Sequence, residues 1–243
     1  MRRIGILGGM GPEATVLLMQ KLIAAVPARD DADHIPLIVD QNPQVPSRIR
    51  FLIEGTGEDP GPVLAAMAAG LERAGAEALA MPCNTAHHFA PAIRAAVEIP
   101  FLDMVAMAAD RARTEAGSGG KVGILASPAV RKVGLFDAAL ARVGLKAVYP
   151  DDEAAMLAAI RSIKAEGASD AARVVLKGAS AALLGNGARV QMIACTEFSL
   201  IAESVAQSAT VFDTLDVLVS AIKDFAQDRA EERPATAPQV AGP

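Results

Sequence analysis

The sequence predicts an α/β protein of two pseudo-symmetric three-layer α/β/α domains, with mainly parallel sheets and a ligand site in the cleft between the domains. Three observations lead to this prediction. Short apolar segments alternate with helical patterns, 243 residues are enough for two domains of ordinary size, and two motifs recur in the second half of the chain. The 52% apolar and 21% charged residues are typical of a well-packed globular protein.

Six short apolar runs have the length and composition of strands that are buried on both faces: residues 3–7, 35–40, 77–81, 121–125, 146–149 and 189–194. Helical patterns lie between them. The clearest covers residues 62–75, because it starts with a proline and ends at Gly75. Two further helices are expected at 86–97 and 198–207. Strands that alternate with helices predict parallel sheets with helices on both faces.

A weak internal repeat supports two related halves. RRIGILGG at 2–9 is similar to GKVGILAS at 120–127, and EALAMPCNTAHH at 77–88 is similar to RVQMIACTEFSL at 189–200. We interpret these pairs as the trace of a duplicated α/β unit. The expected organisation is an N-terminal domain at 1–115, a second domain at 116–209 and a C-terminal helix at 210–228 that returns to the first domain. The charged, Pro- and Ala-rich segment 229–243 is expected to be disordered.

Composition excludes several classes of function. No stretch approaches about 18 uninterrupted apolar residues, so no membrane segment is expected. The start, MRRIGILGG, has too few apolar residues for a signal peptide, which favours a cytoplasmic protein with reduced cysteines. A net charge of −5 without a basic cluster argues against nucleic acid as a partner.

The two cysteines, Cys83 and Cys195, follow equivalent strands of the two halves. Cys83 lies in AMPCNTAHHF and could be a buried structural thiol, a metal ligand or a catalytic group. Ligands of open α/β sheets bind at the carboxyl ends of the strands, so both thiols are expected to face one cleft. The expected helices behind the cysteines would favour thiolate. Inversion of a stereocentre requires this arrangement, with one group to remove a proton and another to return one to the opposite face.

Two other motifs suggest rival functions. Gly9, Gly11 and Ala14 satisfy G-x-G-x-x-A, with Asp40 after the next strand, as in dinucleotide-binding enzymes. The interval before Asp40 is long for that fingerprint, and the function leaves both cysteines unexplained. We therefore expect the glycine turn around Met10 to place backbone N–H groups near a small carboxylate.

Metal binding is the second rival. His87 and His88 are adjacent, so on a helix they point about 100° apart and cannot share an ion. No metal site is expected, and His87 and His88 are interpreted as supporting or surface residues. Glu197 has two open interpretations, orienting a neighbour of Cys195 or capping the next helix.

Four motifs, GGMGPEAT at 8–15, NPQVPSR at 42–48, PCNTAH at 82–87 and CTE at 195–197, resemble the aspartate racemase branch of the cofactor-independent aspartate/glutamate racemase superfamily. The resemblance extends to about residue 225. It implies an isomerase with two pseudo-symmetric domains, paired acid/base cysteines, no pyridoxal phosphate or metal, and a homodimeric assembly.

The resemblance also implies roles for individual residues. Cys83 and Cys195 match the acid/base pair, and Asn84, Thr85 and Thr196 match polar groups around the amino and carboxylate ends of the substrate. Arg48 matches an arginine that holds a carboxylate, a task that suits a bidentate and permanently charged guanidinium. Lys164 matches the lysine that aspartate-specific members use for the second carboxylate.

One segment departs from the family. Relatives commonly have a threonine-rich turn after the strand at 121–125, whereas this chain has LASPAVRK at 125–132 and keeps only Ser127 as a substrate-binding hydroxyl. The substrate could therefore be aspartate, glutamate or a wider range of amino acids. A noncatalytic amino acid binding protein is the alternative from another functional class.

Overall fold

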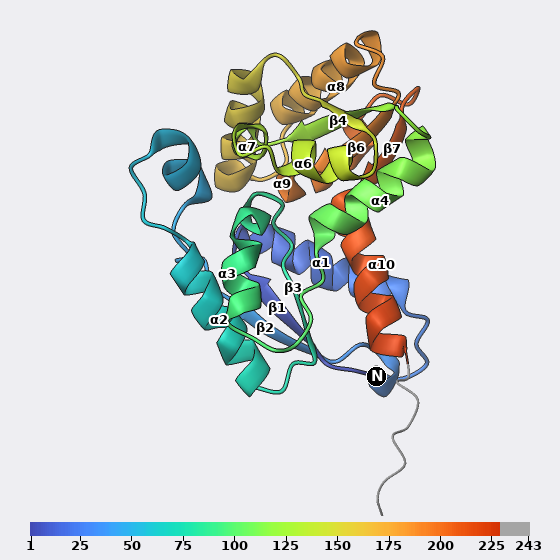
Figure 1. Ribbon diagram of the computed structural model, residues 1–243. Helices are drawn as coiled ribbons and strands as arrows, with labels where there is room; N and C mark the ends of the chain where they lie inside the picture. The colour runs from blue at the N-terminus through green and yellow to red at the C-terminus, as the bar shows by residue number, and fades with distance from the viewer. Residues whose placement is uncertain (229–243) are drawn as a thin grey trace, which may run out of the picture.

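The chain forms two parallel sheets, each between two layers of helices (Figure 1). The computed structural model describes residues 1–228, and the segment expected to be disordered, 229–243, lies outside the described residues. The architecture confirms the predicted fold class, a three-layer α/β arrangement that occurs twice.

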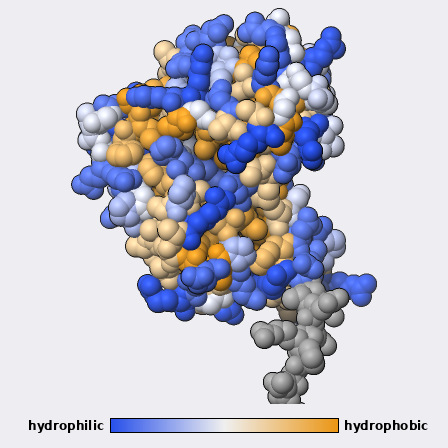
Figure 2. All heavy atoms as spheres, in the orientation of Figure 1, coloured by the Kyte–Doolittle hydropathy of each residue, from blue (hydrophilic) through white to orange (hydrophobic). Residues whose placement is uncertain are grey.

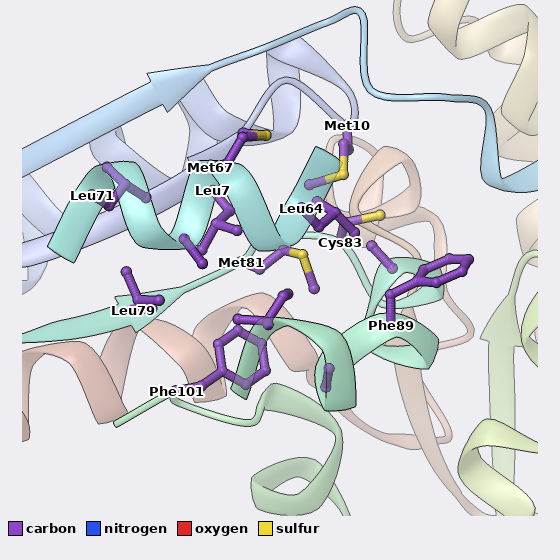
Figure 3. Close-up of a cluster of buried hydrophobic side chains, with 14 of the residues drawn as sticks. Leu7, Met10, Leu64, Met67, Leu71, Leu79, Met81, Cys83, Phe89 and Phe101 are labelled. Atoms are coloured by element: carbon purple, nitrogen blue, oxygen red, sulfur yellow. The ribbon is translucent and has the colours of Figure 1, made fainter. Parts of the chain in front are cut away.

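The first sheet has the order β2-β1-β3, with β1 (Ile4–Gly8), β2 (Leu37–Gln41) and β3 (Ala78–Ala80) all parallel. Helices α2 (Gly61–Arg73) and α3 (Ala90–Ala95) cover one face. Leu7, Leu64 and Leu79 lie in the core on this side (Figure 3). Helices α1 (Pro12–Ala25) and α10 (Thr214–Gln227) cover the other face, where Ile4 and Ile6 are fully buried. Successive residues of β1 thus alternate between two cores, as a strand buried on both sides requires.

The second sheet has the order β5-β4-β6-β7, also all parallel: β4 (Lys121–Ala126), β5 (Lys146–Val148), β6 (Val190–Ala194) and β7 (Thr210–Asp213). Helices α4 (Met104–Ala116) and α6 (Leu135–Arg142) pack on one face, and α7 (Glu153–Glu166) and α8 (Asp170–Gly185) pack on the other. The remaining elements are short: α5 (Pro128–Lys132), α9 (Thr196–Ser199) and turns of other helical types at Asp31–Asp33, Arg50–Glu54, Thr85–Phe89 and Ala202–Ser204.

All six predicted strands are confirmed to within about two residues at their ends, but the helices that follow the cysteines are shorter than expected. The range 86–97 is a 3₁₀ turn followed by α3, which starts beside Pro91. The range 198–207 contains the end of the single turn α9 and a 3₁₀ turn. There the N–H of Ala206 donates to the hydroxyl of Ser180 on α8 at 3.1 Å. That contact ties the chain to α8 in place of another helical turn.

The C-terminal segment also differs from its expected form. Residues 210–213, which we expected to begin the returning helix, form β7 at the edge of the second sheet. Helix α10 begins only at Thr214, with Asp213 as its N-cap. The TVF sequence at 210–212 has β-branched and aromatic residues, which favour a strand.

The two halves use glycine in the same way. A Cβ atom on Gly5 in β1 would lie 2.8 Å from Leu79 Cδ2 and 3.1 Å from Leu71 Cβ on α2. A Cβ atom on Gly123 in β4 would lie 3.0 Å from atoms of Gln191 and of Leu183 on α8. Each central strand therefore lacks a side chain where its helix approaches, and this shared packing supports the duplication.

The last helix of each half crosses to the other sheet. Phe101 pairs with Leu79 beside β3, and the chain then enters α4, whose residues pack on the second sheet. In the second half, β7 pairs with β6, and the chain then enters α10, whose Leu215 and Leu218 pack on the first sheet. This reciprocal crossing buries part of each half against the other.

None of the described helices is sufficiently long and apolar to cross a membrane. Hydrophilic and hydrophobic side chains are mixed over the face shown in Figure 2.

Candidate active site

A cavity of about 400 Å³ lies at the carboxyl ends of the strands, between the two halves. Its first wall is the glycine turn after β1 and the segment before Arg50, and its second wall comes from α7 and the turns after β4 and β6. Seven of the predicted site residues line it: Met10, Arg48, Cys83, Thr85, Ser127, Lys164 and Cys195. Ser127 also caps α5, because its hydroxyl accepts from the N–H of Ala129 at 3.3 Å.

Both cysteines are buried and free, with exposed fractions of 7% for Cys83 and 6% for Cys195, and both line this cavity. Figure 3 shows Cys83 at the edge of the hydrophobic core beside Met10 and Leu64. Each cysteine follows the corresponding strand of its half, β3 or β6. Each cysteine therefore lies in the wall of one shared cavity with only a small fraction of its surface exposed.

His87 positions the turn that carries Cys83. Its Nε2 accepts a hydrogen bond from the N–H of Met104 at 3.2 Å, so the proton is on Nδ1, which donates to the carbonyl of Cys83 at 2.9 Å. Burial lowers the pKa of His87, which is consistent with this neutral tautomer. His87 therefore joins the Cys83 turn to the start of α4, and both of its nitrogens are occupied. In residues 1–228 no group of three His, Cys, Asp or Glu side chains could hold a metal ion.

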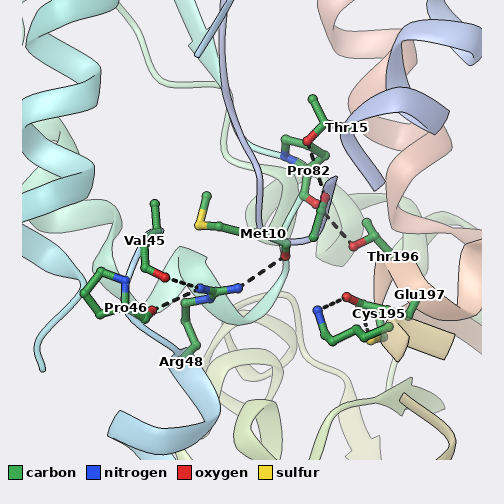
Figure 4. A network of polar contacts seen from close by, with 11 residues as sticks. Met10, Thr15, Val45, Pro46, Arg48, Pro82, Cys195, Thr196 and Glu197 are labelled. Atoms are coloured by element: carbon green, nitrogen blue, oxygen red, sulfur yellow. Dashed lines mark hydrogen bonds and ion pairs between the residues drawn. The ribbon is translucent and has the colours of Figure 1, made fainter. Parts of the chain in front are cut away.

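Cys195 has charged neighbours. Its Sγ donates to Oε2 of Glu197 at 3.0 Å (Figure 4), and Oε1 of Glu197 forms an ion pair with Nζ of Lys164. Burial raises the pKa of Cys195, the Glu197 carboxylate raises it further, and Lys164 opposes them in part. This direction is opposite to the sequence expectation of a helix that favours thiolate, because α9 is a single turn and a carboxylate lies beside the sulfur.

The structure supports the interpretation in which Glu197 orients a neighbour of Cys195, since its carboxylate pairs with Lys164 and also contacts Cys195 itself. Burial by itself would lower the pKa of Lys164, but its negative and hydrogen-bonding neighbours, foremost the Glu197 carboxylate, together outweigh burial and the pKa is raised. Lys164 therefore remains an ammonium ion at the wall of the cavity.

Arg48 faces the cavity from the first half. Its Nη1 donates to the carbonyls of Val45 at 3.2 Å and Pro46 at 3.0 Å, and its Nη2 donates to the carbonyl of Met10 at 3.5 Å (Figure 4). These acceptors are neutral, and no carboxylate of the described residues forms an ion pair with Arg48. Three backbone carbonyls thus orient a guanidinium whose charge is available to an anion.

Asn84 and Thr196, also predicted to bind substrate, are buried outside the lining of the cavity. The amide of Asn84 donates to the hydroxyl of Thr214 at 3.0 Å, and the hydroxyl of Thr196 donates to the carbonyl of Pro82 at 3.2 Å. Both bonds join the first half to the second. The Thr196 bond connects the residue after Cys195 with the residue before Cys83, so it holds the two cysteine turns together.

Comparison with known proteins agrees with this geometry. The Asp/Glu/Hydantoin racemase family matches residues 7–222. The chain belongs to this family. An aspartate racemase from Picrophilus torridus is similar at 26% identity and a TM-score of 0.80, with 93% of this chain and 94% of that chain covered. Membership favours racemase chemistry over the dinucleotide-binding alternative.

Two more distant structures share the fold. An aspartate racemase homologue from Pyrococcus horikoshii OT3 has 24% identity and a TM-score of 0.72, covering 93% of this chain and 99% of its own. A glutamate racemase isoform from Bacillus anthracis has 18% identity and a TM-score of 0.67, covering 93% and 82%.

Several lining residues of this racemase-family chain were not predicted from its sequence: Pro43, Val45, Ser47, Ile160 and Leu200. Pro43, Val45 and Ser47 lie in the NPQVPSR motif, from which only Arg48 was assigned a role, whereas Ile160 and Leu200 belong to no motif and reach the cavity only through the fold. One feature of the sequence pointed to a role for Glu197, namely an acidic residue two positions after a cysteine. Its ion pair with Lys164 could not be predicted, because Lys164 is on a different helix.

Proposed function

We propose that the protein is a cofactor-independent amino acid racemase that interconverts the L and D forms of an acidic amino acid, with aspartate as the first candidate. One observation carries the proposal. Two cysteines from equivalent positions of two related halves line a single cavity that also contains two cations, Arg48 and Lys164. Family membership agrees with this chemistry.

The proposed reaction uses the two sulfurs in turn. The thiolate of one cysteine takes the proton from Cα, and the thiol of the other cysteine gives its proton to the opposite face. One S–H bond forms and one breaks, so the enzyme ends with the protonation states of Cys83 and Cys195 exchanged. Solvent restores the starting state, and the reverse direction uses the same steps in the opposite order. No cofactor is required by this scheme.

The two cations suit a substrate with two carboxylates. Arg48 would bind one of them through its free charge, and Lys164 would bind the other in competition or in common with Glu197. Aspartate is favoured because the Picrophilus torridus relative is an aspartate racemase, whereas glutamate and a broader range of amino acids remain the alternatives. We further propose that the protein is cytoplasmic and forms a homodimer. Light scattering of the purified protein would test the dimer.

Incubation with L-aspartate in deuterium oxide tests the proposal. A racemase should produce D-aspartate, seen by chiral chromatography, and should introduce deuterium at Cα, seen by mass spectrometry. Glutamate and alanine in parallel samples would define the substrate range. A noncatalytic binding protein would leave both the configuration and the isotope unchanged.

Two single variants examine the cysteine pair. Cys83→Ser and Cys195→Ser should each lower turnover by about 10²- to 10⁴-fold, because an alcohol is too weak an acid to replace a thiol. Circular dichroism should show that both variants remain folded. A rate near that of the wild type in either variant would remove that cysteine from the mechanism.

A further inference from the structure

The two sulfurs have different surroundings, although their positions in the fold correspond. Thr85 lies two residues after Cys83, and Glu197 lies two residues after Cys195; both line the cavity. The Sγ atom of Cys195 donates a hydrogen bond to Glu197 at 3.0 Å, whereas no hydrogen bond to the Sγ atom of Cys83 is found within residues 1–228. A carboxylate therefore accompanies one of two otherwise equivalent thiols.

Glu197 is held in this position. Its second oxygen forms an ion pair with Nζ of Lys164, and its side chain is only 10% exposed. The glycine turn of the first half packs against the pair, since a Cβ atom on Gly11 would lie 3.5 Å from Nζ of Lys164 and 3.7 Å from Oε1 of Glu197. The carboxylate cannot turn away from Cys195 without disturbing its ion pair with Lys164.

This arrangement favours the thiol form of Cys195. A thiolate there would stand 3.0 Å from a carboxylate in a buried environment, where repulsion between like charges is poorly screened. The ammonium of Lys164 would then have to balance two negative charges. A thiol, in contrast, gives the carboxylate a charge-assisted hydrogen bond. Burial and Glu197 together raise the pKa of Cys195, in agreement with this geometry.

We propose that Glu197, fixed by Lys164, is a positioning residue that keeps Cys195 as an oriented thiol, so that Cys83 is the sulfur that begins turnover as thiolate. This inference rests on the proposed racemase function. Cys83 takes the Cα proton, Cys195 delivers its own proton to the other face, and exchange with solvent then returns a proton to Cys195 and removes one from Cys83. Conversion of the opposite enantiomer begins from the exchanged state, with Cys195 as thiolate and Cys83 as thiol, which the Glu197 carboxylate disfavours.

Alkylation by iodoacetamide tests the inference without substrate. The thiolate is the reactive form of cysteine, and peptide mass spectrometry separates the rates at Cys83 and Cys195. In the wild type, Cys83 should react faster than Cys195 near neutral pH. Glu197→Gln should raise the rate at Cys195 at least about tenfold, the effect of one pKa unit, and should leave Cys83 unchanged.

The corresponding residue of the first half provides a matched control. Thr85→Val alters the same position relative to Cys83 and should leave the rate at Cys195 at its wild-type value. If Glu197→Gln fails to fold, Glu197→Asp serves instead: a carboxylate that is one methylene shorter should raise the rate at Cys195 by a smaller factor. An unchanged or lower rate at Cys195, or an equal gain at both cysteines, would overturn the proposal.

Kinetics give a second readout that a merely structural role would not move. The upper limb of the pH profile of kcat/KM reports the acid of the free enzyme, so Glu197→Gln should shift that limb to lower pH. A change in kcat alone, with the upper limb of the pH profile unmoved, would contradict the inference.

The proposed function and the role of Glu197 can also fail separately. Wild-type protein that racemises no amino acid overturns the proposed function, whereas active wild type with unaltered Cys195 reactivity in the variant overturns the role of Glu197.

Discussion

Asp213 offers a quantitative test of how a buried N-cap carboxyl affects the stability of the fold. It is 5% exposed, and its Oδ1 accepts the N–H of Leu215 at 2.8 Å as the N-cap of α10. Burial raises the pKa of this carboxyl from 3.8 to about 6. Asp213→Asn should keep the cap, because an amide oxygen also accepts the N–H bond, and should remove the cost of a buried charge.

The sign of the effect follows from the raised pKa. The folded protein holds the proton more tightly than the unfolded chain, so the stability contributed by that proton is complete below about pH 4 and is lost as pH rises through about 6. Relative to low pH, the raised pKa of Asp213 lowers the free energy of unfolding by about 1 kcal/mol at pH ~4.5 and by about 3 kcal/mol at pH ~8. The free energy of unfolding of Asp213→Asn, relative to that of the wild type, should therefore be about 2 kcal/mol more favourable at the higher pH than at the lower.

Urea unfolding of wild type and variant at both pH values would measure the difference. Asp103→Asn is the matched control, because Asp103 caps α4 at the corresponding position of the first half. Burial would raise the pKa of Asp103, but the hydrogen bond from the N–H of Ala106 and the Arg94 guanidinium help to lower it. Asp103→Asn should thus destabilise at neutral pH and less in acid. Equal changes at both pH values in Asp213→Asn would refute the reasoning.

Two further substitutions address the site. Arg48→Ala should raise KM for aspartate roughly 10- to 100-fold, because a charged hydrogen-bond partner of the substrate is lost, and steady-state kinetics showing an unchanged KM would place Arg48 outside the binding site. Thr196→Val should lower the free energy of unfolding by about 1 to 3 kcal/mol, because the buried carbonyl of Pro82 loses its donor. Urea unfolding that shows no loss would mean that this bond does not hold the cysteine turns together.

Local patterns in the sequence were sufficient for six of the seven described strands and for the correspondence between Cys83 and Cys195. A strand buried on both faces needs a continuous apolar run, and a duplicated unit repeats its residues in order, so both features can be read along the chain. The resemblance located Arg48 and Lys164, which lie in the cavity as expected.

Other features depend on contacts between segments far apart in the chain. β7 is a strand because β6 offers it a free edge, and Asn84 and Thr196 find partners in the opposite half. Glu197 acquires its role from Lys164 on α7 and from the sulfur that it faces. The sequence alone located six of the seven described strands and showed that a cysteine follows one strand in each half. Only the tertiary structure decided which charge lies beside each sulfur, because burial and ion pairing arise from the packing of separate elements.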